Sequence, residues 1–181
     1  MNGRPMNGRP QIAEREISQY LLFDVAEQPY AIPVLRVMEI LSLPELTRVP
    51  RLTERVRGLM NLRGTVLPVI DLSARFGFGP SHVTRFTTVV VVPVAAEGST
   101  TRMGFVSDLM RDVIDLAPSD ILPPPQFGTT IDVSFLQGMA KVGETFVFIL
   151  DMDRVLSVDE LLEVHSELDA ARVNHPLELI A

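Results

Sequence analysis

The chain has 181 residues, of which 46% are hydrophobic and 22% are charged, a balance typical of a folded globular protein and not of a disordered one. The absence of cysteine excludes disulfides, thiolate metal sites and a cysteine nucleophile. The net charge of −7 lies mostly at the end, with −6 on residues 151–181 and −1 on residues 1–150, so the chain lacks the basic face that a nucleic-acid partner requires.

Residues 1–16 are expected to form a disordered N-terminal tail. The pentapeptide Met-Asn-Gly-Arg-Pro occurs twice in it, so that Met6 is an alternative start and a vector-derived sequence is a third interpretation. The tail lacks the apolar stretch of a signal peptide. Because the longest apolar run, residues 89–96, is far shorter than the roughly 20 residues that span a bilayer, we expect a cytoplasmic protein with no direct insertion into a membrane.

Two apolar, strand-like runs follow, at residues 20–25 and 30–41, with the polar turn 26–29 between them. Proline cannot donate a hydrogen bond within a sheet, so Pro33 in the second run indicates a sheet edge or a bulge at that point. Both runs predict β-structure at the start of the chain.

The next segment combines a short helix with a hairpin. Residues 52–58 contain a capping threonine and a terminal glycine, which predict one or two helical turns. Residues 59–70 form two apolar halves around Arg63-Gly64, and a two-residue turn with glycine is typical of a β-hairpin. Asp71 is then placed to cap a second short helix.

After a Gly- and Pro-rich boundary at residues 77–81, the same kinds of element recur. Residues 86–92 and 103–114 predict two apolar strands, and residues 118–125 predict a turn-rich connection. Residues 135–150 predict a second hairpin, again closed by a two-residue turn with glycine.

The order and spacing of these elements indicate an internal duplication. Residues 58–76 align with residues 138–156, with 12 of 19 positions alike in identity or class, and residues 30–43 align with residues 103–116. Any two buried hairpins would look somewhat alike, but the shared order and spacing favour duplication. Two small β units would then share one apolar interface, since neither is large enough for a robust core alone.

From Ser157 the pattern becomes helical. Ser157 and Glu160 have the spacing of a capping box, and the apolar residues that follow fall on one side of the helix, with acids opposite. Residues 158–181 are therefore expected to form an acidic C-terminal helix and tail. Two interpretations stay open: the extension is dispensable for the core, or its charge tunes the choice of partner.

No catalytic motif is present, because the chain lacks a phosphate-binding Gly-rich loop, a paired-histidine zinc motif and a serine nucleophile elbow. None of the three histidines has a partner at metal-ligand spacing. Asp151 and Asp153 share one side of a strand end and suggest either a cation site or a strand exit with a helix cap; Asp71 caps without a companion, which favours the cap. We expect no enzyme, no cofactor and no metal.

The turn Asn61-Leu62-Arg63-Gly64, followed by the strand 66–72, resembles the CheW family of chemotaxis coupling proteins. Further matches occur in family order over residues 19–158, most of the chain. They are the strand 35–40, Gly58, the segment 104–108, Asp112-Val113, Asp120-Ile121 with residues 123–127, and Gly138. Agreement of order over this length is far more specific than a single Gly-rich turn.

The resemblance implies a mainly β fold of two SH3-like five-stranded β-barrels packed on a shared hydrophobic core, with short helices and a C-terminal helix. This implication agrees with the internal duplication. We accordingly expect the first barrel in residues 17–77 and the second in residues 78–157, together forming a single CheW-like domain.

The resemblance also implies a non-catalytic adaptor that couples methyl-accepting chemoreceptors to the histidine kinase CheA, in chemotaxis arrays on the inner face of the cytoplasmic membrane. Its partners would be the CheA regulatory domain and the cytoplasmic receptor tip. The alternative is a coupling protein of a non-flagellar chemosensory pathway, such as surface motility. A sensor or enzyme would need a pocket with convergent polar groups, which the apolar strands do not offer. A structural subunit that caps receptor arrays without a kinase fits the sequence as well.

Residues at the matching positions carry the binding roles that the resemblance implies. The resemblance implies that Glu39 and Arg63 face each other, and a planar guanidinium can hold a carboxylate in that arrangement. With Val37, these residues are expected to form the kinase-binding site. An ordinary core valine is the alternative for Val37. Receptors are expected to dock in the groove between the barrels, on five residues: Gly58, Val89, Val90, Gly104 and Val113.

Overall fold

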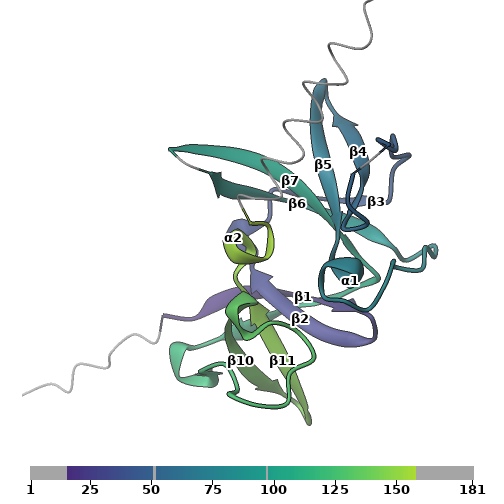
Figure 1. The fold of residues 1–181 in the computed structure, drawn as a ribbon. Helices are drawn as coiled ribbons and strands as arrows, with labels where there is room; N and C mark the ends of the chain where they lie inside the picture. The colour runs from purple at the N-terminus through teal and green to yellow at the C-terminus, as the bar shows by residue number, and fades with distance from the viewer. Residues whose placement is uncertain (1–15, 51, 97, 158–181) are drawn as a thin grey trace, which may run out of the picture.

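The computed structural model describes residues 16–50, 52–96 and 98–157, which form two curled sheets (Figure 1). Sheet A has the strand order β8-β1-β2-β11-β10-β9, with β1 (Ser18–Val25), β2 (Gln28–Pro33), β8 (Leu109–Leu116), β9 (Ile121–Leu122), β10 (Leu136–Val142) and β11 (Thr145–Leu150). Sheet B has the order β3-β6-β7-β5-β4, with β3 (Glu39–Ser42), β4 (Val56–Leu62), β5 (Thr65–Asp71), β6 (Thr88–Ala96) and β7 (Ser99–Ser107). The helical turns are η1 (Val34–Arg36), α1 (Leu72–Arg75), η2 (Pro118–Asp120), η3 (Val133–Phe135) and α2 (Met152–Val155). Over these ranges, no helix is long and apolar enough to cross a membrane.

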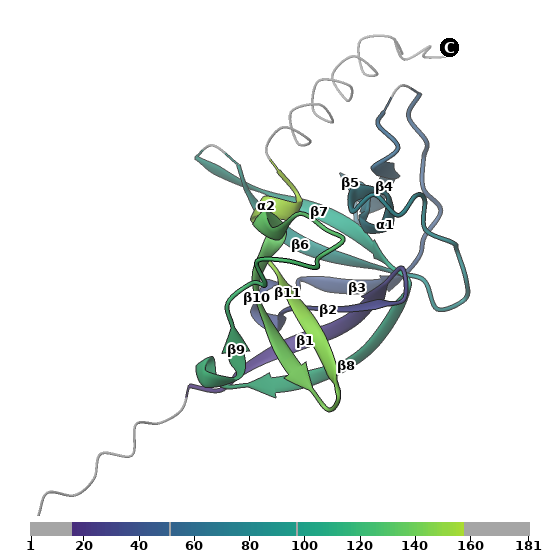
Figure 2. The same ribbon diagram turned by 60° about the horizontal axis from the view of Figure 1, so that its bottom comes forward.

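Each sheet curls into a barrel because the chain that leaves one edge strand returns to the opposite edge. Beyond β3, Thr47 pairs with Leu59 of β4. Beyond β8, the short strand β9 pairs with β10 (Figure 2). The predicted mainly β fold of two SH3-like barrels is confirmed, with β9 as a sixth strand in sheet A. The predicted C-terminal helix, at residues 158–181, lies outside the described residues.

Both predicted hairpins form, and their turns explain the glycines. Leu62 pairs with Thr65, so Arg63 and Gly64 make a two-residue turn with φ of 51° and 85°. Positive φ at both positions defines the type I′ turn, whose twist matches that of the flanking strands. The Asn61 side chain accepts a hydrogen bond from the backbone N–H of Gly64 at 2.8 Å, which fixes the turn further.

Short helices follow both hairpins and are capped by aspartates, as predicted. The Asp71 carboxylate accepts a hydrogen bond from Ala74 N–H, and Asp151 accepts hydrogen bonds from the N–H groups of Asp153 and Arg154. The interpretation of Asp151 as a helix cap is therefore confirmed.

The predicted helix over residues 52–58 is wrong, because its last residues belong to β4. Val56 pairs with Ile70 of β5, and Gly58 pairs with Val69. Pairing with a buried neighbouring strand outweighs the local capping signal of this segment.

The register of the strands confirms the internal duplication residue by residue. Gly58 pairs with Val69 after a bulge in β4, and Gly138 pairs with Ile149 after a bulge in β10. The helix caps Asp71 and Asp151 stand at the same offset of 80 residues, as the chain numbering shows. The upstream alignment also holds, because Ile40 lies opposite Val90 in sheet B, and Val113 lies opposite Leu21 in sheet A.

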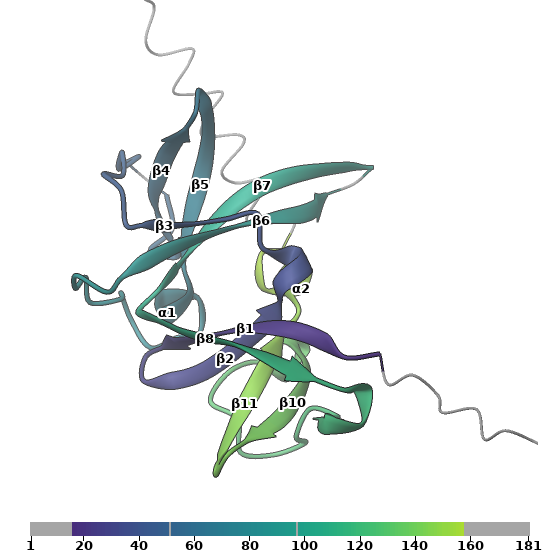
Figure 3. The same cartoon turned by 180° about the vertical axis from the view of Figure 1, so that it is seen from behind.

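The two repeats nevertheless exchange their N-terminal hairpins. The β1–β2 hairpin lies in sheet A beside β11, with Ala31 opposite Ile149, and the β6–β7 hairpin lies in sheet B beside β5 (Figure 3). Both of these contacts are parallel pairings. The predicted boundary between barrels of residues 17–77 and 78–157 is therefore wrong, because each barrel takes strands from both segments.

The long strands predicted over residues 30–41 and 103–114 each break where the chain passes between sheets. The first divides into β2, η1 and β3, and the second divides into β7 and β8 at Asp108. At that corner the Asp108 carboxylate accepts a hydrogen bond from Ala26 N–H at 2.7 Å, and Asp108 N–H donates to the Asp24 carbonyl at 3.0 Å. Burial raises the pKa of the Asp108 carboxyl, while the bond from Ala26 opposes that effect.

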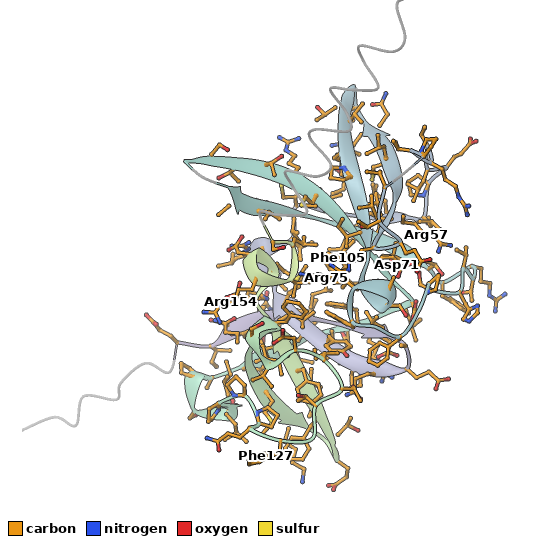
Figure 4. All side chains as sticks on the ribbon, viewed as in Figure 1. Arg57, Asp71, Arg75, Phe105, Phe127 and Arg154 are labelled. Carbon is orange, nitrogen blue, oxygen red and sulfur yellow. The ribbon has the colours of Figure 1, made fainter. Side chains whose placement is uncertain are left out.

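The described residues form three apolar clusters, one inside each barrel and one between the barrels. The cluster between the barrels includes Phe105, which is labelled in Figure 4. Aromatic rings pack there, with centroids 5.2 Å apart for Phe23 and Phe105 and 5.3 Å apart for Tyr30 and Phe76. Each buried side chain of this size contributes about 1.5–3 kcal/mol of transfer free energy. The predicted shared core is confirmed, and it joins the two barrels as one packed unit.

An ion pair between Arg36 and Asp153, which we call the polar latch, connects α2 to the segment that leads into β3. The Arg36 guanidinium donates two hydrogen bonds to the Asp153 carboxylate, at 2.8 and 3.0 Å, and a third to the Pro93 carbonyl at 2.9 Å. Asp153 also accepts a hydrogen bond from Ala95 N–H at 3.0 Å. The Arg36 guanidinium holds the pKa of the Asp153 carboxyl below its ordinary value.

The latch makes stability depend on pH in a defined direction. A carboxyl whose pKa is lower in the folded state stabilises the fold above its unfolded-state pKa, and this contribution disappears as the pH falls through the folded-state value. The Asp153→Asn variant should therefore melt about 2–4 °C below the wild type near pH 7, with the gap closing below about pH 4. Thermal melting across this pH range checks the expectation, and a gap that is unchanged or wider in acid contradicts it.

Candidate protein-docking surface

The start of β3 and the β4–β5 turn meet at one end of the sheet B barrel. There the Arg63 Nη2 donates a hydrogen bond to Glu39 Oε1 at 2.8 Å. The Arg63 side chain is 77% exposed and that of Glu39 is 22% exposed. The predicted pairing of these two residues is confirmed. An ion pair this exposed adds little stability, so its value lies in holding a charged, planar group at the surface.

Val37, the third residue of the predicted kinase site, lies elsewhere than expected. It follows η1 and packs, half-buried, against the core between the barrels. The exposed apolar side chains of this edge belong to its neighbours Leu35, Met38 and Ile40, which are 96%, 48% and 43% exposed. We call these three residues the β3 edge patch. Sequence reasoning missed them because the turn η1 resets the alternation of the strand.

The predicted receptor groove does not form from the residues assigned to it. The side chains of Val89 and Val90 have no exposed surface, Val89 inside the sheet B barrel and Val90 in the core between the barrels. Gly104 provides space for Val89, since a Cβ atom at Gly104 would lie 2.8 Å from Val89 Cγ1. These positions shape the interior and offer no side chain for direct contact in this conformation.

Gly58 is also an interior position. A Cβ atom there would lie 2.8 Å from the Thr47 carbonyl oxygen, and the φ of +153° is one that other residues rarely adopt. Thr47 and Leu59 exchange backbone hydrogen bonds of 2.8 and 2.9 Å beside it. Gly58 therefore allows the barrel to close, which explains the glycine without a binding partner.

Val113 differs from the other four, because its side chain is 44% exposed on the outer strand β8 of sheet A. By the internal duplication it corresponds to Ile40 of the β3 edge patch. Arg111, two residues earlier, donates a hydrogen bond from Nε to Asp24 Oδ1 at 2.7 Å, which anchors β8 to β1. The outer strands β3 and β8 thus each present an apolar side chain at the same repeat position.

Buried polar groups stiffen the loop that follows α1. The Asp71 carboxylate accepts hydrogen bonds from the backbone N–H and the hydroxyl of Ser81, at 2.9 and 2.8 Å. It also lies 3.3 Å from Arg57 Nη1 (Figure 4). These bonds satisfy a fully buried carboxylate, so the group serves the structure and needs no ligand.

Comparison with known proteins places the chain among chemotaxis proteins. It is 32% identical to the chemotaxis protein CheW of Helicobacter pylori over 153 residues, 84% of this chain and 89% of that protein. It is 29% identical to the chemotaxis protein CheW of Klebsiella aerogenes over 143 residues, 79% of this chain and 84% of that protein.

A solved structure and a family model agree with these relatives. The crystal structure of the scaffolding protein TtCheW from Thermoanaerobacter tengcongensis superimposes with a TM-score of 0.71 and 28% identity, covering 87% of this chain and 96% of that one. The family model described as the CheW-like domain matches residues 19–160. With its two-barrel fold, and with this family model matched over most of its length, the chain belongs to the CheW-like family.

Proposed function

We propose that the chain is a non-catalytic adaptor that couples methyl-accepting chemoreceptors to the histidine kinase CheA, in the cytoplasm at receptor arrays. Membership of the CheW-like family supports a scaffold role in chemotaxis. The observation that carries the more specific proposal is the β3 edge patch beside the Glu39–Arg63 pair. An apolar centre with a charged rim is the usual composition of a protein-docking surface.

The kinase is proposed to bind the sheet B barrel at this patch. Met38 and Ile40 would supply the apolar contact, and the exposed Arg63 guanidinium would offer further hydrogen bonds to a carboxylate or carbonyl of the kinase. Among the strands that the structure describes, none pairs with the outer edge of β3, so its backbone groups can pair with an incoming strand.

The receptor is proposed to bind elsewhere, on the face that includes Val113 of β8. A receptor tip is a helical hairpin, and helices bind by placing an apolar stripe against an apolar surface. The core between the barrels packs against both Val37, which precedes β3, and Met110 of β8. The two proposed docking surfaces are therefore held in a fixed position relative to each other. Such stiffness suits a coupling function.

Simultaneous binding is the direct test of the proposal. The purified chain is mixed with the CheA regulatory domain and a receptor-tip fragment, and complexes are analysed by size-exclusion chromatography with light scattering. A complex whose mass matches all three components, and exceeds that of the chain with either partner alone, supports the adaptor role. Binding of one partner that excludes the other would refute coupling, and binding of the receptor fragment alone would favour a structural subunit of arrays.

Met38→Arg should weaken kinase binding about tenfold or more while leaving the melting temperature nearly unchanged, because a charged side chain replaces an apolar contact at the interface centre. Phe146→Arg is the matched control, since Phe146 is also 48% exposed but lies on β11 of sheet A. Isothermal titration calorimetry gives the affinities. Equal losses in the two variants would contradict the assignment of the kinase to the β3 edge patch.

A further inference from the structure

The β3 edge patch lies directly beside the point where the C-terminal segment leaves the described structure. Arg36, next to Leu35, holds Asp153 of α2 through two hydrogen bonds of 2.8 and 3.0 Å. Figure 3 shows α2 beside the turn of residues 34–36 that leads into β3. The described chain ends at Ser157, only four positions after Asp153. Whatever follows Ser157 therefore starts next to the patch.

The chemistry of residues 158–181 matches that surface. The segment carries six acids and one arginine, with leucines and valine at helical spacing on one side: Val158, Leu161, Leu162 and Leu168. Ser157 and Glu160 have the spacing of a capping box that would begin a helix at the exit point. Exposed arginines lie near the patch, Arg63 on the β4–β5 turn and Arg102 on β7 opposite Pro93. Acids facing these arginines would orient the segment.

We propose that residues 158–181 fold back as an amphipathic helix onto the β3 edge patch and act as a tethered competitor for the partner that docks there. Leu35, 96% exposed, would be covered by the apolar stripe of the helix. The choice of the kinase as the displaced partner rests on the proposed function; the intramolecular contact does not. A short tether gives an effective concentration of about millimolar, so even a weak contact is populated.

Competition from residues 158–181 lowers the apparent affinity of the partner for the β3 edge patch but does not prevent binding. A partner must displace the helix, so its apparent affinity falls by the fraction of molecules in which the patch is open. The contact is partly between charges on an exposed surface, and salt therefore weakens it. The segment would regulate access while remaining dispensable for the fold of the barrels.

Disulfide trapping tests the contact between residues 158–181 and the β3 edge patch. The chain has no native cysteine, so only the introduced pair can form a disulfide within one molecule. The full chain carrying Leu35→Cys with Leu161→Cys is oxidised, and the monomeric disulfide is followed by non-reducing electrophoresis and mass spectrometry. Thr100→Cys with Leu161→Cys is the matched control, because Thr100 is exposed and lies opposite Ala95, which also contacts Asp153. We expect the Leu35 pair to form about tenfold faster than the control.

A second variant tests whether the apolar stripe of residues 158–181 binds the β3 edge patch or only lies near it. Leu162→Glu with Leu168→Glu removes the apolar stripe and should lower the rate of the Leu35 pair to that of the Thr100 control. If, in chains that keep Leu162 and Leu168, the Leu35 and Thr100 cysteine pairs form disulfides at equal rates, the proposal is overturned. A disulfide that forms only between molecules also overturns it, since it would make a second copy the occupant of the patch.

Truncation after Ser157 then tests the consequence for the partner. The truncated chain should bind the CheA regulatory domain severalfold more tightly than the full chain, with the difference shrinking at high salt. Unchanged affinity, with both forms binding, overturns competition. If neither form binds the kinase but the Leu35 disulfide forms selectively, the proposed function fails while the intramolecular contact stands.

Discussion

Gly58→Asp should lower the melting temperature sharply and abolish binding of both partners together. The new side chain would place its Cβ 2.8 Å from the Thr47 carbonyl oxygen, at a φ of +153° that disfavours any side chain. The carboxylate would also enter a buried position, against Leu46 and Thr47. Backbone strain costs about 1–3 kcal/mol, and the steric clash and the burial of a charge add to it, so the total is at least about 3 kcal/mol.

This expectation differs from what the family resemblance suggests for Gly58, namely a selective effect on receptor binding. Thermal melting and two titrations, one for each partner, distinguish the alternatives. Thr65→Asp is the control, since it adds the same carboxylate to the same hairpin at an exposed position. If the Gly58→Asp protein melts like the wild type and loses receptor binding but not kinase binding, Gly58 belongs to the receptor-binding surface.

Arg63→Ala should leave the fold intact and reduce kinase binding about tenfold, equal to about 1.4 kcal/mol. Stability changes little because the Arg63 side chain is 77% exposed, and pairs of this kind contribute about 0–1 kcal/mol. Position 63 has a φ of 51°, and alanine carries a Cβ as arginine does, so the strain of the turn should be about the same in the variant. Calorimetric titration with the CheA regulatory domain measures the effect.

Arg63→Lys tests whether charge alone is enough. Lysine keeps the positive charge but lacks the planar fork that holds Glu39 and a further acceptor at once, so it should restore only part of the affinity. Full receptor-to-kinase coupling by Arg63→Ala would exclude a role for the pair. A fall in melting temperature as large as the fall in affinity would show that the turn had been disrupted.

Local structure in this protein follows closely from sequence. Type I′ turns need positive φ at both central residues, which makes Arg63-Gly64 recognisable, and a strand that ends in aspartate predicts the caps at Asp71 and Asp151. The duplication was visible for the same reason, because each repeat obeys the same local rules. These features depend on neighbours in the chain and not on distant contacts.

The exchange of hairpins could not be predicted because it depends on where an apolar strand breaks. Residues 103–114 read as one continuous strand, and the break occurs at Asp108, whose carboxylate bonds to Ala26 more than 80 positions away. Similarly, apolar residues in a run cannot be divided by sequence into exposed and buried. Val89 and Val90 face two different cores, while Ile40 of β3 and Met38 just before it remain exposed.

The exchange of hairpins has a consequence for how the protein is made. The β1–β2 hairpin is synthesised before the other strands that the structure describes, yet β2 pairs with β11, with Ala31 opposite Ile149. Contacts so distant in sequence slow folding, because the intervening chain must close a long loop before they form. The free edge of β2 stays unpaired until β11, at Thr145–Leu150, has been synthesised, and during this time the nascent chain is open to association with other chains.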